Sequence, residues 1–111
     1  MNYKIHITKK AEADLISAAD YIEFTLLNPK AADDLIDKAE EEINKLSFSP
    51  KSHKLVEEPV LKSWGIRFIL INNYMAFFKV DDELKTVFII RFLYGKRNWT
   101  EILKNEPFSL I

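Results

Sequence analysis

Residues 2–8, NYKIHIT, alternate strictly between apolar and polar side chains. Tyr3, Ile5 and Ile7 share one face, as in a half-buried β-strand, whose side chains point to opposite faces in turn. Thr8 closes the alternation and is a residue type that commonly caps the N-terminus of a helix. The pattern predicts a strand that leads directly into a helix.

Between residues 9 and 46 the apolar positions recur every three or four residues, which indicates amphipathic helices. The face of the first helix that we expect to be buried consists of Ala11, Leu15, Ala18, Ile22 and Leu26. The corresponding face of the second helix consists of Ala32, Leu35, Ile36, Ala39, Ile43 and Leu46. The pair Asn28-Pro29 separates them, because a residue before proline avoids the helical conformation, and it also suits the N-cap and first turn of the next helix. So short a break predicts an antiparallel helical hairpin.

After residue 63 the apolar period changes to two. The segments that follow are rich in β-branched and aromatic residues: WGIRFILI (64–71), YMAFFKV (74–80) and TVFIIRFLY (86–94). Asn72-Asn73 and residues 81–84 supply the turns of an antiparallel meander. Because these strands are apolar on both faces, we expect both faces of the sheet to be covered.

Two shorter segments complete the chain. Residues 51–63 form a polar connection, and NWTEILKN (98–105) predicts a short final helix after the interruption at Gly95. The predicted fold class is α+β, in the order β-α-α-β-β-β-α, with a helical hairpin packed on an antiparallel sheet and a short C-terminal helix. We expect residues 1–111 to form a single domain.

Composition narrows the chemistry that this domain can perform. The absence of cysteine excludes disulfides, thiol nucleophiles and cysteine-ligated zinc. A net charge of −1 argues against broad binding of polyanions, which depends on many summed phosphate contacts. Acidic side chains are in excess up to residue 59, and basic ones are in excess after it. A basic site in the second half and a charged helix face in the first would each produce that division.

The sequence predicts neither a cofactor nor a metal site. His6 and His53 have no histidine or carboxylate partner at ligand spacing. His53 lies between Lys51 and Lys54, where it could act as a general acid, although such a histidine is more often part of a plain surface loop. The N-terminus lacks the apolar run of a signal peptide and no later segment reaches membrane-spanning length, so we expect a cytoplasmic protein.

Cations near the predicted strands are the main candidates for function. Arg67 and Arg91 interrupt apolar strands, so each must reach a carboxylate, a backbone carbonyl or a cleft. An ion pair with a helix carboxylate is the structural alternative for both. Lys96 and Arg97 follow Gly95 at a strand end, where side chains are exposed around a rigid scaffold.

Two aromatic residues flank the same turn. Trp99 stands within an amphipathic turn, so we interpret it as the residue that seats the final helix rather than as a platform for a base. Tyr94 fits either a core or a functional role.

Four segments in order resemble the successive signatures of the RelE/ParE superfamily, the toxins of type II toxin–antitoxin modules. They are AEADLISAADYI (11–22), NPKAADDLIDKAEEEINKLSFSP (28–50), NYMAFFKVD (73–81) and VFIIRFLYGKRNWTEIL (87–103). The resemblance extends over nearly the whole chain, from Tyr3 to Leu103. It implies a helical hairpin on an antiparallel sheet, and an acidic or partly disordered antitoxin, encoded in the same operon, that folds onto the toxin.

One branch of this superfamily, similar to RelE, cleaves mRNA on the ribosome and needs no metal. The resemblance then implies Arg67, Arg91 and Arg97 as phosphate ligands, with Tyr94 or His53 as the acid–base group. Three features depart from that branch. Met75 stands where an arginine for the scissile phosphate is typical, and Leu103 stands where a catalytic tyrosine would be. On the preceding strand, where a lysine pair is expected, only Arg67 is available.

The other branch, similar to ParE, poisons DNA gyrase by binding it, and the start of the first helix and the RFLYGKRNW ending favour this branch. The resemblance therefore implies the toxin of a plasmid-stabilisation module that inhibits DNA gyrase without catalysis and is neutralised by a cognate antitoxin. The target-facing residues would be Arg91, Lys96, Arg97 and Trp99. The mRNA endoribonuclease is the alternative. A third hypothesis is a protein that keeps the toxin fold but no longer inhibits growth, and that serves as an antitoxin-binding or repressor subunit.

Overall fold

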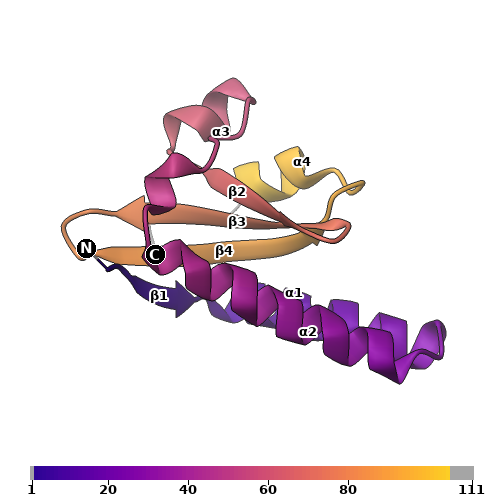
Figure 1. Ribbon diagram of the computed structural model, residues 1–111. Coiled ribbons are helices and arrows are strands. Elements are labelled where there is room, and N and C mark those ends of the chain that lie inside the picture. Colours follow the sequence, from indigo (N-terminus) through magenta and orange to yellow (C-terminus); the bar gives the residue numbers. More distant parts are fainter. Residues whose placement is uncertain (1, 106–111) are drawn as a thin grey trace.

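The strand that the opening alternation predicts lies at one edge of a four-stranded sheet (Figure 1). The computed structural model describes residues 2–105. The sheet has the order β1-β4-β3-β2, and its strands are β1 (Lys4–Ile7), β2 (Arg67–Ile71), β3 (Tyr74–Asp81) and β4 (Thr86–Tyr94). The predicted antiparallel meander of β2, β3 and β4 is confirmed. β1 joins β4 in parallel, so the sheet is mixed at this edge.

The predicted helical hairpin is confirmed, together with both of its caps. α1 (Lys9–Asp20) begins after Thr8, whose Oγ1 accepts a hydrogen bond from the Ala11 amide at 3.2 Å. α2 (Pro29–Asn44) begins after Asn28, whose Oδ1 accepts one from the Ala31 amide at 3.1 Å. These bonds satisfy amides that a helix leaves free in its first turn.

Two residues that were predicted to point inward are exposed. Leu26 is 57% exposed because a π-helical turn, η1 (Tyr21–Thr25), follows α1. The Leu26 amide donates to the Tyr21 carbonyl at 3.1 Å, and this i→i+5 bond rotates the following residues away from the α-helical phase. Ile7 is 41% exposed because it is the last residue of a short edge strand.

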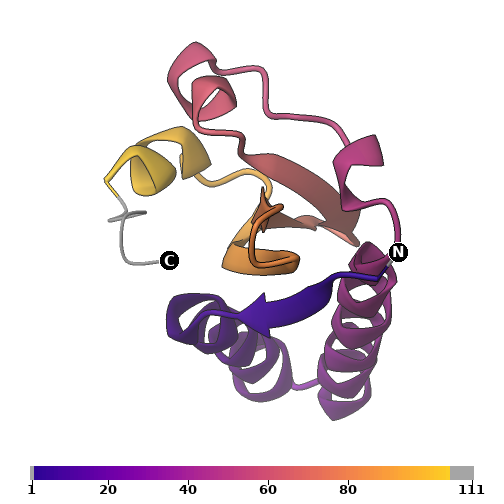
Figure 2. The same ribbon diagram turned by 90° about the vertical axis from the view of Figure 1, so that its left-hand side faces the viewer.

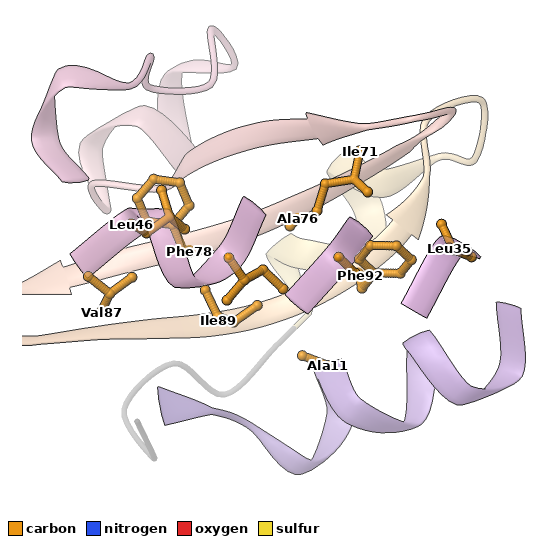
Figure 3. Packing of buried hydrophobic residues seen from close by; sticks show 11 residues of the cluster. Ala11, Leu35, Leu46, Ile71, Ala76, Phe78, Val87, Ile89 and Phe92 are labelled. Atoms are coloured by element: carbon orange, nitrogen blue, oxygen red, sulfur yellow. The ribbon is translucent and has the colours of Figure 1, made fainter. Parts of the chain in front are cut away.

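Each face of the sheet has its own apolar core, as the two-sided apolar strands predict. The hairpin covers one face, and Figure 3 shows Leu35 and Leu46 of the hairpin side opposite Phe78 and Phe92 of the sheet. The opposite face is covered by α3 (Pro59–Ser63) and α4 (Trp99–Lys104), which lie across the sheet from the hairpin in Figure 2. The buried residues of this second core are Val56, Leu61, Ile66, Phe77, Ile90, Leu93 and Leu103.

The short helix α3 was not expected, because residues 51–63 were interpreted as a polar connection. Glu58 caps it: its Oε1 accepts from the amides of Val60 at 2.6 Å and Leu61 at 3.0 Å. Glu58 also forms an ion pair with Lys104 of α4. This pair joins the two helices that cover the second face.

A bulge in β4 changes which side chains face the hairpin. Phe77 pairs with Arg91 and Phe78 pairs with Ile89, so Ile90 is an extra residue in β4. Strict alternation from Val87 and Ile89 would turn the side chain of residue 93 toward the hairpin. Instead Phe92 belongs to the hairpin-side core and Leu93 to the opposite one.

Candidate functional site

The β4 bulge carries an ion pair that fastens α1 to the sheet. Arg91 Nε donates to Asp14 Oδ2 at 2.6 Å, and Arg91 Nη2 donates to Asp14 Oδ1 at 2.9 Å. The Phe92 amide, which stands beside the bulge, also donates to Asp14 Oδ2, at 3.1 Å. The two charged side chains are only 14% and 15% exposed. Arg91 therefore takes the structural alternative of an ion pair with a helix carboxylate, and Asp14 is the partner.

Arg67 is also held from within the protein. Its Nη1 donates to the backbone carbonyl of His53 at 2.6 Å. The His53 ring lies edge-on against Phe78, with 6.1 Å between ring centroids. Arg67 is the first residue of β2, so its bond to His53 holds the loop before α3 against the start of that strand. This end of β2 lies away from the Asn72-Asn73 turn.

Backbone hydrogen bonds hold the turn after β4, whereas the side chains that it exposes are not held by the protein. The Gly95 amide donates to the Asn73 carbonyl at 2.8 Å, and the Arg97 amide donates to the Tyr94 carbonyl at 3.0 Å. A Cβ on residue 95 would lie 3.2 Å from the Asn73 carbonyl oxygen, a close approach that glycine permits. Within residues 2–105, the exposed side chains of Lys96 and Arg97 make no hydrogen bond or ion pair.

This turn forms one rim of a cleft of about 830 Å³ between the hairpin and the end of the sheet. The hairpin projects beyond the β2–β3 turn, as Figure 1 shows. Residues of the hairpin and of that turn line the cleft. Its apolar floor includes Ala18, Ile22, Leu35 and Phe92. Its rim includes Tyr21, Asn72, Asn73, Tyr74, Tyr94 and Arg97.

Three tyrosines define the character of this cleft. Tyr74 stacks on Phe92 with 5.0 Å between ring centroids and meets Tyr94 edge-on at 5.6 Å. Burial raises the pKa of the Tyr74 hydroxyl, and the neighbouring Tyr94 and Tyr21 raise it further. The cleft therefore offers aromatic surfaces beside the Arg97 cation and the Asp14 carboxylate that pairs with Arg91.

The structure brings together only some of the residues that the sequence singled out. Tyr94 and Arg97 both line the cleft, and Arg91 lies behind it, bound to Asp14 of the cleft wall. Trp99 packs on the opposite face of the sheet, with its ring centroid 5.1 Å from that of Phe77, as the helix-seating interpretation expects.

Sequence reasoning missed Tyr21, Tyr74 and the two turn asparagines as members of a site. The sequence held only an indirect signal for them: Tyr74 follows the Asn72-Asn73 turn, and asparagine tolerates the positive φ, 55°, that Asn72 adopts. Within the described residues, no group of three histidine, cysteine or carboxylate side chains is placed to hold a metal ion. In the same part of the chain, none of the helices has the length and apolar character needed to span a membrane.

Comparison with known proteins agrees with this architecture. The model of the family described as "ParE toxin of type II toxin-antitoxin system, parDE" matches residues 5–99. A chain of a chromosomal ParDE toxin–antitoxin system from P. aeruginosa superimposes with a TM-score of 0.70 at 22% sequence identity, covering 85% of this chain and 97% of that one. A chain of the toxin–antitoxin complex RelBE2 from Mycobacterium tuberculosis superimposes with a TM-score of 0.57, also at 22% identity, covering 85% and 92%. No curated protein matches the sequence. At this identity the two structures establish the shared fold.

Proposed function

The chain belongs to the family of ParE toxins of type II toxin–antitoxin systems, and from that premise we propose that it arrests growth by binding and inhibiting DNA gyrase, without a catalytic set of its own. The family makes it a toxin component with a cognate antitoxin as partner.

One observation carries the preference for a binding mechanism over RNA cleavage. The two strand arginines that a nuclease would need at the scissile phosphate already bind groups of the protein itself. Arg67 binds a backbone carbonyl, and Arg91 binds Asp14. Freeing Arg91 would leave a carboxylate uncompensated in a mostly buried position, which is costly. Met75, on β3 between these strands, supplies no replacement cation.

The contact surface that we assign to gyrase is the turn after β4. Lys96 and Arg97 are exposed there, and the bond between Gly95 and Asn73 fixes the backbone that presents them. Because the backbone of the turn is already ordered, its cations can bind acidic groups of a partner with little further loss of backbone entropy. Arg91 and Trp99 support this turn from the two faces of the sheet rather than contacting the target themselves.

A double substitution of the turn tests the proposal. Lys96→Ala/Arg97→Ala removes two charged contacts, each worth about 1.5 kcal/mol, and should weaken inhibition of gyrase on the order of 100-fold. The matched control is Lys38→Ala/Lys62→Ala, which removes the same charge from exposed positions on α2 and α3. The measurements are supercoiling by purified gyrase, and incorporation of thymidine and methionine after induction. An unchanged inhibition by the turn variant, or an arrest of methionine incorporation before that of thymidine, would refute the proposal.

The ribosome-dependent endoribonuclease remains the second candidate, because Tyr94 and Arg97 line the same cleft. Tyr94 would then act as the acid–base group and Arg97 as a phosphate ligand. This function requires new 5′ ends at fixed codon positions in translated messages after induction, and Tyr94→Phe should abolish them. Mapping the message ends in the wild type and in this variant separates the two functions.

A further inference from the structure

The outer side of the first hairpin helix carries large apolar side chains that belong to neither core. Ile16 is 53% exposed on α1, and Phe24 is 68% exposed on η1. α1 contacts β4 and α2, and its remaining side faces outward in Figure 2. Large apolar side chains that gather on an exposed helix side mark an interaction surface.

The π-helical turn brings these two side chains onto one side of the helix. In an uninterrupted α-helix of 3.6 residues per turn, Phe24 would lie about 80° from Ile16 around the helix axis. The i→i+5 bond from the Leu26 amide to the Tyr21 carbonyl takes an extra residue into the turn. The rotation per residue is therefore smaller across η1, and Phe24 returns toward the side of Ile16.

The same side of α1 has a charge at each end and a small residue between them. Lys9, Ala13, Ile16 and Asp20 recur at intervals of three and four residues, so they share one side of the helix, and all four are exposed. Within residues 2–105, the side chains of Lys9 and Asp20 make no hydrogen bond or ion pair. They lie about 16 Å apart along the helix, so they do not pair with each other.

This side of α1 is complementary to itself when a second copy of the helix runs antiparallel. The register that places Lys9 opposite Asp20 of the second copy also places Ile16 opposite Ala13, and two-fold symmetry makes each pair occur twice. A large side chain thus meets a small one, and the antiparallel direction sets the positive end of one helix dipole beside the negative end of the other. Nucleic acid or an anionic lipid surface fits poorly, because Asp20 would face its phosphates.

We propose that the chain forms a two-fold symmetric homodimer in which α1 packs antiparallel against α1 of a second copy. Phe24 then extends past the start of the other helix toward Ile7, which is 41% exposed at the end of β1. α1 has 12 residues and η1 has 5, which is about 25 Å of helix. A contact of that length is small for a specific interface, so the dimer should be weak, with a dissociation constant in the micromolar range. Lys96 and Arg97 take no part in it, so the dimer does not depend on the target of the toxin.

Charge reversal followed by sedimentation velocity tests the register. Lys9→Glu and Asp20→Lys should each raise the dissociation constant of the dimer at least tenfold, because each turns two attractive pairs into two repulsive ones. A mixture of the two variants should dimerise again, and so should Lys9→Glu/Asp20→Lys, because every pair then joins opposite charges. The matched control is Lys38→Glu, at an exposed position of α2, which should dimerise as the wild type does.

Three results would overturn the proposal. One is a wild-type chain that stays monomeric up to millimolar concentration. Another is a dimer that Lys9→Glu weakens no more than Lys38→Glu does. The third is a mixture of Lys9→Glu and Asp20→Lys that stays monomeric although circular dichroism shows both variants to be folded.

The absence of cysteine permits a second test that does not depend on affinity. A disulfide needs two Cα atoms within about 7 Å of each other. A mixture of Lys9→Cys and Asp20→Cys should therefore cross-link in oxidised glutathione, while the remaining Lys9 and Asp20 still form one of the two ion pairs. Lys9→Cys alone should not cross-link, because position 9 of the two copies lies about 16 Å apart in the antiparallel register.

The cross-linking test also separates the possible arrangements. Lys9→Cys that cross-links with itself indicates parallel helices and overturns the proposal. A mixture of Lys9→Cys and Asp20→Cys that cross-links no faster than Lys38→Cys does reports random collision only, and likewise overturns it.

Discussion

The pair formed by Asp14 and Arg91 should contribute more to stability than any exposed ion pair of this chain. Replacing Asp14 by Leu removes two charge-assisted bonds to Arg91 and leaves the Phe92 amide without its acceptor. Removing one partner of a buried pair costs about 3–5 kcal/mol, and the residual exposure of 14–15% favours the lower end, about 3 kcal/mol. For a 111-residue domain this loss lowers Tm by about 13 °C, taking an unfolding entropy of about 2.1 cal/mol/K per residue.

A double-mutant cycle measured by urea unfolding tests this reasoning. Asp14→Leu and Arg91→Met should each cost about 3 kcal/mol. The double variant should also cost about 3 rather than 6 kcal/mol, because its two uncharged side chains leave no unpaired charge, while the Phe92 amide has lost its acceptor. Asp34→Ala, which breaks the exposed pair with Lys30, is the control and should leave the midpoint within experimental error. Costs that add in the double variant, or single costs below about 1 kcal/mol, would show that the pair does not fasten α1 to β4.

Two further predictions concern the N-terminal edge. Hydrogen bonds from Lys51 and Tyr3 hold the pKa of Asp82 below its usual range, so their contribution is present above the unfolded pKa and is lost as the pH falls through the folded one. The difference in urea midpoint between the wild type and Asp82→Asn should therefore be constant near neutrality and should shrink toward zero below about pH 4. A difference that widens in acid would contradict this. Thr8→Ala should lower the free energy of unfolding by about 1–2 kcal/mol, because Thr8 Oγ1 accepts from the Ala11 amide and donates to the Ile89 carbonyl at 2.9 Å. Thr8→Ser keeps the hydroxyl and should retain most of that stability. Equal losses for the two variants in urea unfolding would disprove the role of the hydroxyl.

Local signals in the sequence were sufficient for most of the fold. Thr8 and Asn28-Pro29 act through their nearest neighbours, so their caps could be predicted without a tertiary structure. The β4 bulge could not be predicted, because a strand that is apolar on both faces has no alternation for a one-residue shift to disturb. The helix α3 was not predicted because it spans only Pro59–Ser63 and is capped by Glu58, which is not among the preferred N-cap residues.

The candidate site was predictable only in part. The exposure of Lys96 and Arg97 follows from Gly95 and the end of an apolar strand, which are local features. The partner of Arg91 was one of many acidic residues in the first half, and only the docking of α1 on the bulge selects Asp14. The cleft depends on how far the hairpin projects beyond the sheet and on the phase change of the π-helical turn, and neither is encoded by any single pattern of residues.

The parallel pairing of β1 with β4 has a consequence for synthesis on the ribosome. Lys4 pairs with Thr86, so the first strand has no partner until residue 86 and those after it have been made. At roughly 5–20 residues per second, the intervening segment takes on the order of 4–16 s to appear. The turn with Lys96 and Arg97 emerges later still, so translation that stops before residue 86 yields the first strand and the hairpin without β4 and without the cations proposed to contact gyrase. Products that stop before residue 86 should therefore be harmless to the cell that makes them, because they lack both β4 and the proposed contact residues.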